Sequence, residues 1–199
     1  MGKRREAANN MEVLRRIVYL VFRPDAEWAR IASEPTTVDL LLRRYILPLS
    51  ALAPLATLIG MRVFDSSWNR EHGYLVPADQ IFNAAATTFF GTIASIFALA
   101  AIMALIAPMY QCKRDYVAAL KVAAYGAIPL LLSGATLLLP AMILVSMVAL
   151  CHTLFLLYVG ATKVLQIRND QAEFIGISLL LLVFVSMMAG MAAASVGLI

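Results

Sequence analysis

The stretch FNAAATTFFGTIASIFALAAIMALIA, residues 82–107, contains no charged side chain. As a helix rising 1.5 Å per residue it is long enough to cross a hydrocarbon layer roughly 30 Å thick. Similar apolar runs recur at 44–62, 118–138, 141–162 and 174–196. The 199-residue chain is 62% hydrophobic and 14% charged, which leaves too little polar surface for a soluble domain. We therefore predict an all-α, polytopic membrane bundle of five transmembrane helices.

The basic residues predict how this bundle is oriented. Five crossings put the termini on opposite sides, and 14 of the 16 Lys and Arg residues fall on the side of the N-terminus. By the positive-inside rule, that side is cytoplasmic and the C-terminus lies outside. The chain then divides into a basic cytoplasmic segment, 1–43, and a five-helix domain, 44–199. We expect an integral protein of a bacterial inner membrane.

Residues 11–23, MEVLRRIVYLVFR, have the periodicity of an amphipathic helix. The apolar face is predicted to hold Leu14, Ile17, Val18 and Val21, and the polar face Glu12, Arg15, Arg16, Tyr19 and Arg23. The segment is too short and too charged to cross a membrane. It is either a helix lying in the interface or a helix packed on the cytoplasmic ends of the spans. We expect Arg15, Arg16, Arg23 and Trp28 to contact anionic lipid headgroups.

A polar stripe is predicted on the third span, where Lys121, Tyr125, Pro129 and Ser133 recur at intervals of four. One interpretation is a polar pathway open to the cytoplasm, because Pro129 frees a backbone carbonyl near mid-membrane. The other is an anchoring lysine, an interhelical hydrogen bond and a packing kink. We expect the stripe to face other helices, with Lys121 at its water-facing end.

His152 lies near the centre of the fourth span, a depth at which an ionisable group is a functional candidate. Nearby methionines offer soft ligands for Cu(I), but they lack a regular ligand spacing, so we predict no metal and no cofactor. No catalytic motif is present, and the spans hold no buried carboxylate for coupled transport. Basic residues confined to one side indicate anionic lipid rather than nucleic acid. We therefore predict a protein that is not an enzyme.

Four segments resemble the bacterial branch of the Yip1 family over roughly residues 11–180: FRPDAEWARIASEP at 22–35, YILPLSALAPLATLIGM at 45–61, ALKVAAYGAIP at 119–129 and LFLLYVGATKVL at 154–165. The resemblance implies about five spans and a cytoplasmic N-terminus. The positions that it carries over are Lys121, Tyr125, Pro129, Pro140, Tyr158, Gly160, Pro24, Trp28 and Pro48. His152 and Thr162 depart from the family pattern, which favours an aromatic residue and a proline there. Eukaryotic relatives take part in vesicle trafficking and bind small prenylated GTPases.

These observations predict a non-enzymatic, self-associating scaffold, or a membrane-organising factor of the trafficking type. Its contacts would be the small-residue faces of the second and fifth spans, because small residues let helices approach closely in lipid. Its cytoplasmic helices would engage lipid or a cytoplasmic protein partner. The alternative is a channel or uncoupled transporter whose path follows the third span, where Lys121, Tyr125, Pro129 and Ser133 are joined by His152, Tyr158 and Gly160.

Overall fold

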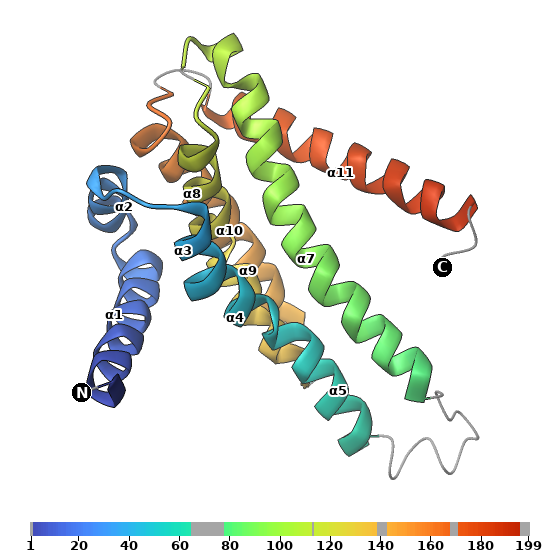
Figure 1. Ribbon diagram of the computed structural model, residues 1–199. Coiled ribbons are helices and arrows are strands. Elements are labelled where there is room, and N and C mark those ends of the chain that lie inside the picture. The colour runs from blue at the N-terminus through green and yellow to red at the C-terminus, as the bar shows by residue number, and fades with distance from the viewer. Residues whose placement is uncertain (1, 65–77, 113, 139–142, 168–170, 196–199) are drawn as a thin grey trace.

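The structure is a computed structural model that describes residues 2–64, 78–112, 114–138, 143–167 and 171–195 (Figure 1). Within these ranges every regular element is helical, which confirms the all-α prediction. The elements are α1 (Gly2–Phe22), α2 (Pro24–Ser33), α3 (Val38–Leu41), η1 (Leu42–Ile46), α4 (Leu47–Ser50), α5 (Leu52–Phe64), α7 (Ala78–Ile106), η3 (Ala107–Tyr110), α8 (Tyr116–Gly126), α9 (Ile128–Ser133), η4 (Gly134–Leu138), α10 (Ile143–Lys163) and α11 (Gln171–Ser195).

Four helical segments among the described residues are long and apolar enough to cross a membrane. They are Val38–Gly60, Gln80–Tyr110, Tyr116–Thr136 and Leu144–Lys163. The first four predicted spans coincide with these segments, although the first begins earlier than predicted. The predicted fifth span falls on α11, whose described apolar stretch, Ala172–Met187, is shorter than a crossing. The chain is thus an integral membrane protein, and the count of five remains a prediction.

The spans form an up-and-down bundle (Figure 1). The chain descends through α3–α5, returns along α7, descends again through α8 and α9 and returns along α10. One end of the bundle therefore gathers the start of α3, the end of α7, the start of α8 and the end of α10. We call this the basic end, because Arg43, Arg44, Arg114 and Lys163 lie on the segments that meet there.

The spans are interrupted where their residues break regular helical hydrogen bonding. A π-helical turn, η1, occupies Leu42–Ile46 between α3 and α4. The third span breaks at Ala127, just before Pro129, whose ring lacks the N–H that an uninterrupted helix would use. The two breaks are joined by a ring contact. Tyr45 of η1 packs against Tyr125, two residues before Ala127, with ring centroids 4.9 Å apart.

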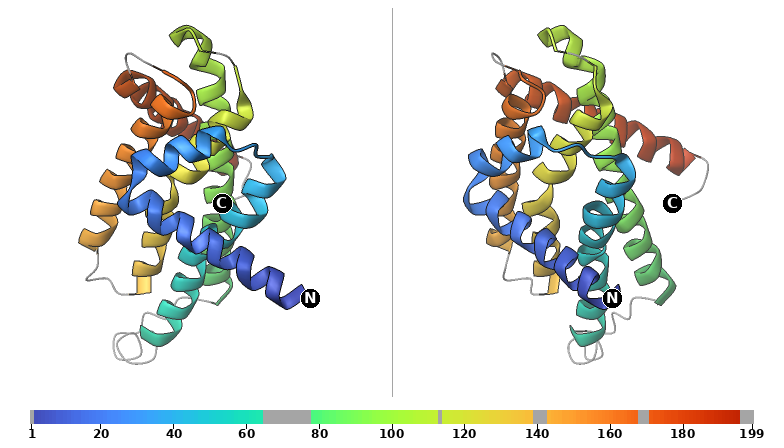
Figure 2. Two further views of the ribbon diagram at one scale, coloured as in Figure 1. Left: turned by 90° about the vertical axis from the view of Figure 1, so that its left-hand side faces the viewer. Right: turned by 60° about the vertical axis from the view of Figure 1, so that its left-hand side comes forward.

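Two helices depart from the direction of the bundle. Helix α1 crosses the outside of the bundle at a steep angle to α7, and α11 slants away from α7 toward its C-terminal end (Figure 2). A turn at Pro24 joins α1 to α2, and proline suits the first helical position because that position needs no N–H partner. We call α1 and α2 together the N-terminal hairpin. It packs on α8 and α10 at the basic end.

Candidate functional site

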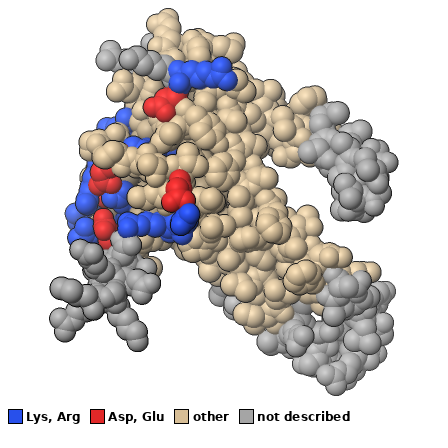
Figure 3. Space-filling view, viewed as in Figure 1, with Lys and Arg blue, Asp and Glu red and all other residues tan. Residues whose placement is uncertain are grey.

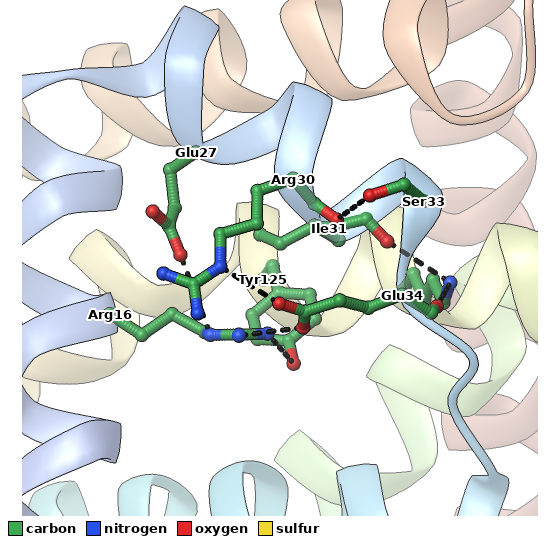
Figure 4. Close-up of polar contacts among 8 residues, drawn as sticks. Arg16, Glu27, Arg30, Ile31, Ser33, Glu34 and Tyr125 are labelled. Atoms are coloured by element: carbon green, nitrogen blue, oxygen red, sulfur yellow. Dashed lines mark hydrogen bonds and ion pairs between the residues drawn. The ribbon is translucent and has the colours of Figure 1, made fainter.

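The candidate site is a group of charged and aromatic side chains between the N-terminal hairpin and α8. Helix α8 begins at Asp115, whose side chain accepts a hydrogen bond from the Ala118 amide at 3.0 Å. This cap sets the start of the helix and thereby which residues face the hairpin. Lys121 and Tyr125, one turn apart, both point toward it and are buried. The cluster formed with them by Arg16, Glu27 and Glu34 is called the Arg16 cluster below (Figure 4).

Arg16 lies at the centre of this cluster, with 8% of its side chain exposed. Its Nη2 atom lies 2.6 Å from Oε2 of Glu34, and its Nε atom lies 3.5 Å from Oε1 of Glu27. Its Nη1 atom donates to the hydroxyl of Tyr125 at 3.4 Å. One guanidinium thus joins α1, α2 and α8, using the several donors that arginine presents in a planar arrangement.

Glu34 also forms an ion pair with a second arginine. The Nε atom of Arg30, four residues earlier, lies 2.9 Å from its Oε1 atom. Burial works against ionisation of this carboxyl, but the hydrogen bonds from Arg16 and Arg30 prevail and lower the pKa of Glu34 below its ordinary value. Burial likewise opposes the charge on Arg16, yet the hydrogen bond to Glu34 raises the pKa of Arg16 above its usual range. Both groups therefore remain charged at neutral pH.

Lys121 fastens the end of α2 to the bundle. Its ammonium donates to the backbone carbonyls of Ile31 at 3.1 Å and of Glu34 at 2.6 Å. The last carbonyls of a helix have no partner within the helix, and a cation there also complements the helix dipole. The side chain is only 7% exposed, so the expectation that Lys121 forms the water-facing end of the stripe is wrong. The backbone carbonyls at the C-terminus of α2 bind the Lys121 ammonium in place of water.

Trp28 forms the apolar side of the site. Its side chain is fully buried, and its ring packs edge-on to Tyr125 with centroids 6.3 Å apart. Gly160 of α10 lies directly under the indole, so that a Cβ atom added at Gly160 would lie 2.8 Å from Cη2 of Trp28. Only glycine allows this approach. Two residues predicted from the family resemblance thus meet across the interface between α2 and α10.

Polar groups in the deeper part of the predicted stripe form hydrogen bonds with nearby groups of the bundle. Pro129 and Ser133 are buried, and the Ser133 hydroxyl donates to the Leu130 carbonyl at 2.8 Å. The Leu130 amide, next to the helix break, donates to the Thr153 hydroxyl of α10 at 3.2 Å. These contacts satisfy polar groups within the bundle, as a span requires.

His152 and Tyr158 lie apart from the Arg16 cluster. His152 packs near Phe155 with ring centroids 5.9 Å apart, and its Nε2 atom is buried without a hydrogen-bond partner among the described residues. Tyr158 is 44% exposed on the outer surface of α10. Among the described residues, no hydrogen bond or ring contact of these two side chains joins them to Lys121, Tyr125, Pro129 or Ser133, so their predicted grouping with the stripe stays a prediction. In the part of the chain that is described, no group of three or more His, Cys, Asp or Glu residues is placed to hold a metal ion.

The four predicted lipid-interface residues separate into two pairs. Arg15 and Arg23 are exposed on the surface of α1. Arg16 and Trp28 are buried instead, which corrects the prediction for these two side chains. The reason is that α1 and α2 dock on the bundle, so residues facing α8 and α10 leave both water and lipid. The residues of the predicted apolar face of α1 differ in burial, because Ile17 packs inward with Arg16 while Leu14 and Val18 face outward.

Three residues of the site were not predicted from the sequence: Glu27, Glu34 and Tyr45. The carboxylates lie on a different helix from the arginine that they bind, and periodicity within one segment carries no information about such a pair. One signal was present for Arg16, which lies on the same helical face as Val13 and Leu20. A charged residue on an inward face requires a buried partner.

The arrangement is that of a clamp between helices. Each described polar group of the Arg16 cluster is paired with a neighbour in the chain. The chemistry that the cluster supplies is therefore attachment of the hairpin to the spans.

Comparison with known proteins gave one finding. The family model described as the Yip1 domain matches residues 18–190, which includes the last five residues of α1, all of α2 and the four described spans. No curated protein and no solved structure matches the chain.

Proposed function

Because the chain belongs to the Yip1 family, a family of membrane proteins, we propose that it is a non-enzymatic scaffold that self-associates in the membrane. We infer that it organises the membrane as a trafficking-type factor does, by presenting its hairpin from an assembly of copies. We further propose the bacterial inner membrane as its location, with the basic end and the N-terminus cytoplasmic and the C-terminus outside, as the positive-inside rule requires.

The observation that carries this proposal is one exposed face of α7. Ala84, Thr87, Thr88, Gly91 and Ala94 recur at helical spacing and are all exposed. A Cβ atom added at Gly91 would meet nothing within 4 Å. The Thr88 hydroxyl bonds the Ala84 carbonyl of its own helix at 2.8 Å, so it presents little unsatisfied polarity. In lipid, such a face allows a second helix to approach closely and pack well.

We assign this face to a second copy of α7. The corresponding role proposed for the end of the fifth span concerns side chains that lie outside the described residues. The first test is to replace Gly91 with leucine, which fills the face without touching the rest of the same chain. Gly176 of α11 is a matched control, since it also has nothing within 4 Å of an added Cβ atom.

Mass measurement in mild detergent and cross-linking in membranes should show oligomers of the parent protein and of Gly176→Leu. Gly91→Leu should shift the mass toward the monomer while retaining its helical content. A cysteine at Gly91, in a background lacking Cys112 and Cys151, should form a disulfide between copies, and a cysteine at Phe82 on another face of α7 should not. A parent protein found only as a monomer overturns the proposal.

The channel or uncoupled transporter remains the second candidate, and polar groups that follow α8 and α9 to Ser133 favour it. Arg16 and the hairpin cover the basic end of this row, so a path requires the hairpin to leave. Cysteine at Ser133, labelled by a water-soluble reagent from the basic side only when Arg16 is replaced, supports the path. Protection of that cysteine in both backgrounds supports simple packing.

A further inference from the structure

The surface of α1 divides into three faces when its residues are placed at 100° intervals. The first face packs on the bundle and holds Arg16, Ile17 and Leu20, which are buried. The second face is apolar and outward, and Met11, Leu14, Val18 and Phe22 on it are 69%, 63%, 52% and 77% exposed. The third face is polar and also exposed, and it holds Glu12, Arg15 and Tyr19; Arg23, which directly follows α1, is exposed as well.

The setting of α1 gives these faces fixed directions. Arg16 holds the first face against α2 through its ion pairs with Glu27 and Glu34, and against α8 through its hydrogen bond to Tyr125, so these contacts set the rotation of α1 about its own axis. Helix α1 also lies across the spans instead of along them (Figure 2). Lysine and arginine side chains gather over the hairpin side of the molecule, whereas the surface over the spans is almost free of charge (Figure 3).

We propose that the second face of α1, together with Arg15 and Arg23, forms a binding surface for an anionic phospholipid leaflet. Met11, Leu14, Val18 and Phe22 enter the boundary between headgroups and acyl chains, and Arg15 and Arg23 meet the lipid phosphates. A helix with an apolar face and flanking basic residues lies in a membrane interface in this way. Each basic residue near an anionic surface adds attraction.

The charges favour lipid over a second copy of this helix as the occupant. Two α1 helices packed through their second faces would bring Arg15 and Arg23 of each copy close to like charges, which is unfavourable. Phosphate groups complement the same two arginines. Because one copy carries the whole surface, the inference goes beyond the proposed self-association and does not depend on it.

The test places an environment-sensitive fluorophore on single cysteines of the full chain, in a background lacking Cys112 and Cys151. Val18→Cys reports the second face and Glu12→Cys the polar face. The chain is inserted into nanodiscs that hold one copy each, made of phosphatidylcholine alone or mixed with phosphatidylglycerol. A spin label attached near the headgroup end of the acyl chains quenches the fluorophore when the helix lies in the interface.

We expect quenching and a blue shift at Val18 in the anionic nanodiscs, with little of either at Glu12. Replacing Arg15 and Arg23 with glutamine should reduce the embedded-to-exposed ratio at Val18 by about fivefold for each charge removed. Arg114→Gln, which removes a charge just before the start of α8, should leave the ratio unchanged. Equal quenching at both positions, or no dependence on phosphatidylglycerol, overturns the proposal. Shielding at Val18 that appears only when two copies share a disc assigns the surface to a second copy and overturns it as well.

Discussion

Replacing Arg16 with methionine should release the N-terminal hairpin from the spans. Methionine keeps much of the side-chain volume and removes the charge. Glu27 would then remain about as buried as before, 8% exposed, without the guanidinium that now lies 3.5 Å away. Glu34, with 33% of its side chain exposed and Arg30 still beside it, would lose less. The damage therefore comes chiefly from one buried carboxylate left without a partner.

The magnitude follows from this difference. Breaking a buried ion pair by removing one partner costs roughly 3–5 kcal/mol, and the remaining contacts of Glu34 place Arg16→Met near the lower end of this range. A loss of about 3 kcal/mol changes the ratio of docked to released hairpin by about a hundredfold. Trp28 reports this equilibrium directly, because it is fully buried when the hairpin is docked.

The assay uses Trp28 as the single tryptophan, after Trp68→Phe removes the other one. In nanodiscs, Arg16→Met should shift the Trp28 emission to the red and increase its quenching by acrylamide. Arg15→Met, which removes an exposed charge one position away, should leave both unchanged. The triple variant Arg16→Met, Glu27→Gln, Glu34→Gln should recover much of the protection, because no buried charge is then unpaired. Equal protection in Arg16→Met and Arg15→Met would refute the reasoning.

Three further predictions use the same reporter and the thermal midpoint. Gly160→Ala should lower the midpoint and expose the tryptophan, because the added methyl group would lie 2.8 Å from the indole, whereas Gly176→Ala meets open space and should leave both values unchanged. Lys121→Met should release the end of α2, since two helix carbonyls lose their donor at a cost of roughly 1–3 kcal/mol, and a protected tryptophan in this variant would contradict the assignment. Arg16 and Arg30 lower the pKa of Glu34, so the ionised Glu34 contributes its full stabilisation above the ordinary pKa of a glutamate. This stabilisation is lost as the pH falls through that value and below it, so the hairpin should loosen over that acidic range. Glu34→Gln should remove this part of the pH dependence.

The spans were predictable from the sequence because the energy that defines them is local. A run such as Gln80–Tyr110 must be apolar over its whole length, and each residue contributes independently of its distant neighbours. The helical breaks near Pro48 and Pro129 were predictable in kind, since proline removes a specific donor. The family resemblance pointed to Trp28 and Gly160 without showing that they touch.

The docked hairpin was not predictable by the same reasoning. An arginine in an amphipathic segment is normally a surface residue. At position 16 the desolvation cost of burying the guanidinium is offset by Glu27 and Glu34, which lie on another helix. Trp28 is likewise typical of a membrane interface, and its burial depends on the absence of a side chain at Gly160. Both placements follow from pairs of residues far apart in the chain.

The π-helical turn at Leu42–Ile46 has a consequence for how this chain tolerates changes of length. Such a turn holds one residue more than an α-helical turn in the same place. Deleting one residue there would restore regular winding and leave the helices on either side close to their present rotation, because five residues of a π-helical turn cover nearly the angle that four α-helical residues cover. Deleting a residue from α4 instead would rotate Tyr45 and the linker to the hairpin by about 100° relative to α5. The π-helical turn is thus a place where this span can lose a residue without changing the register between its two parts.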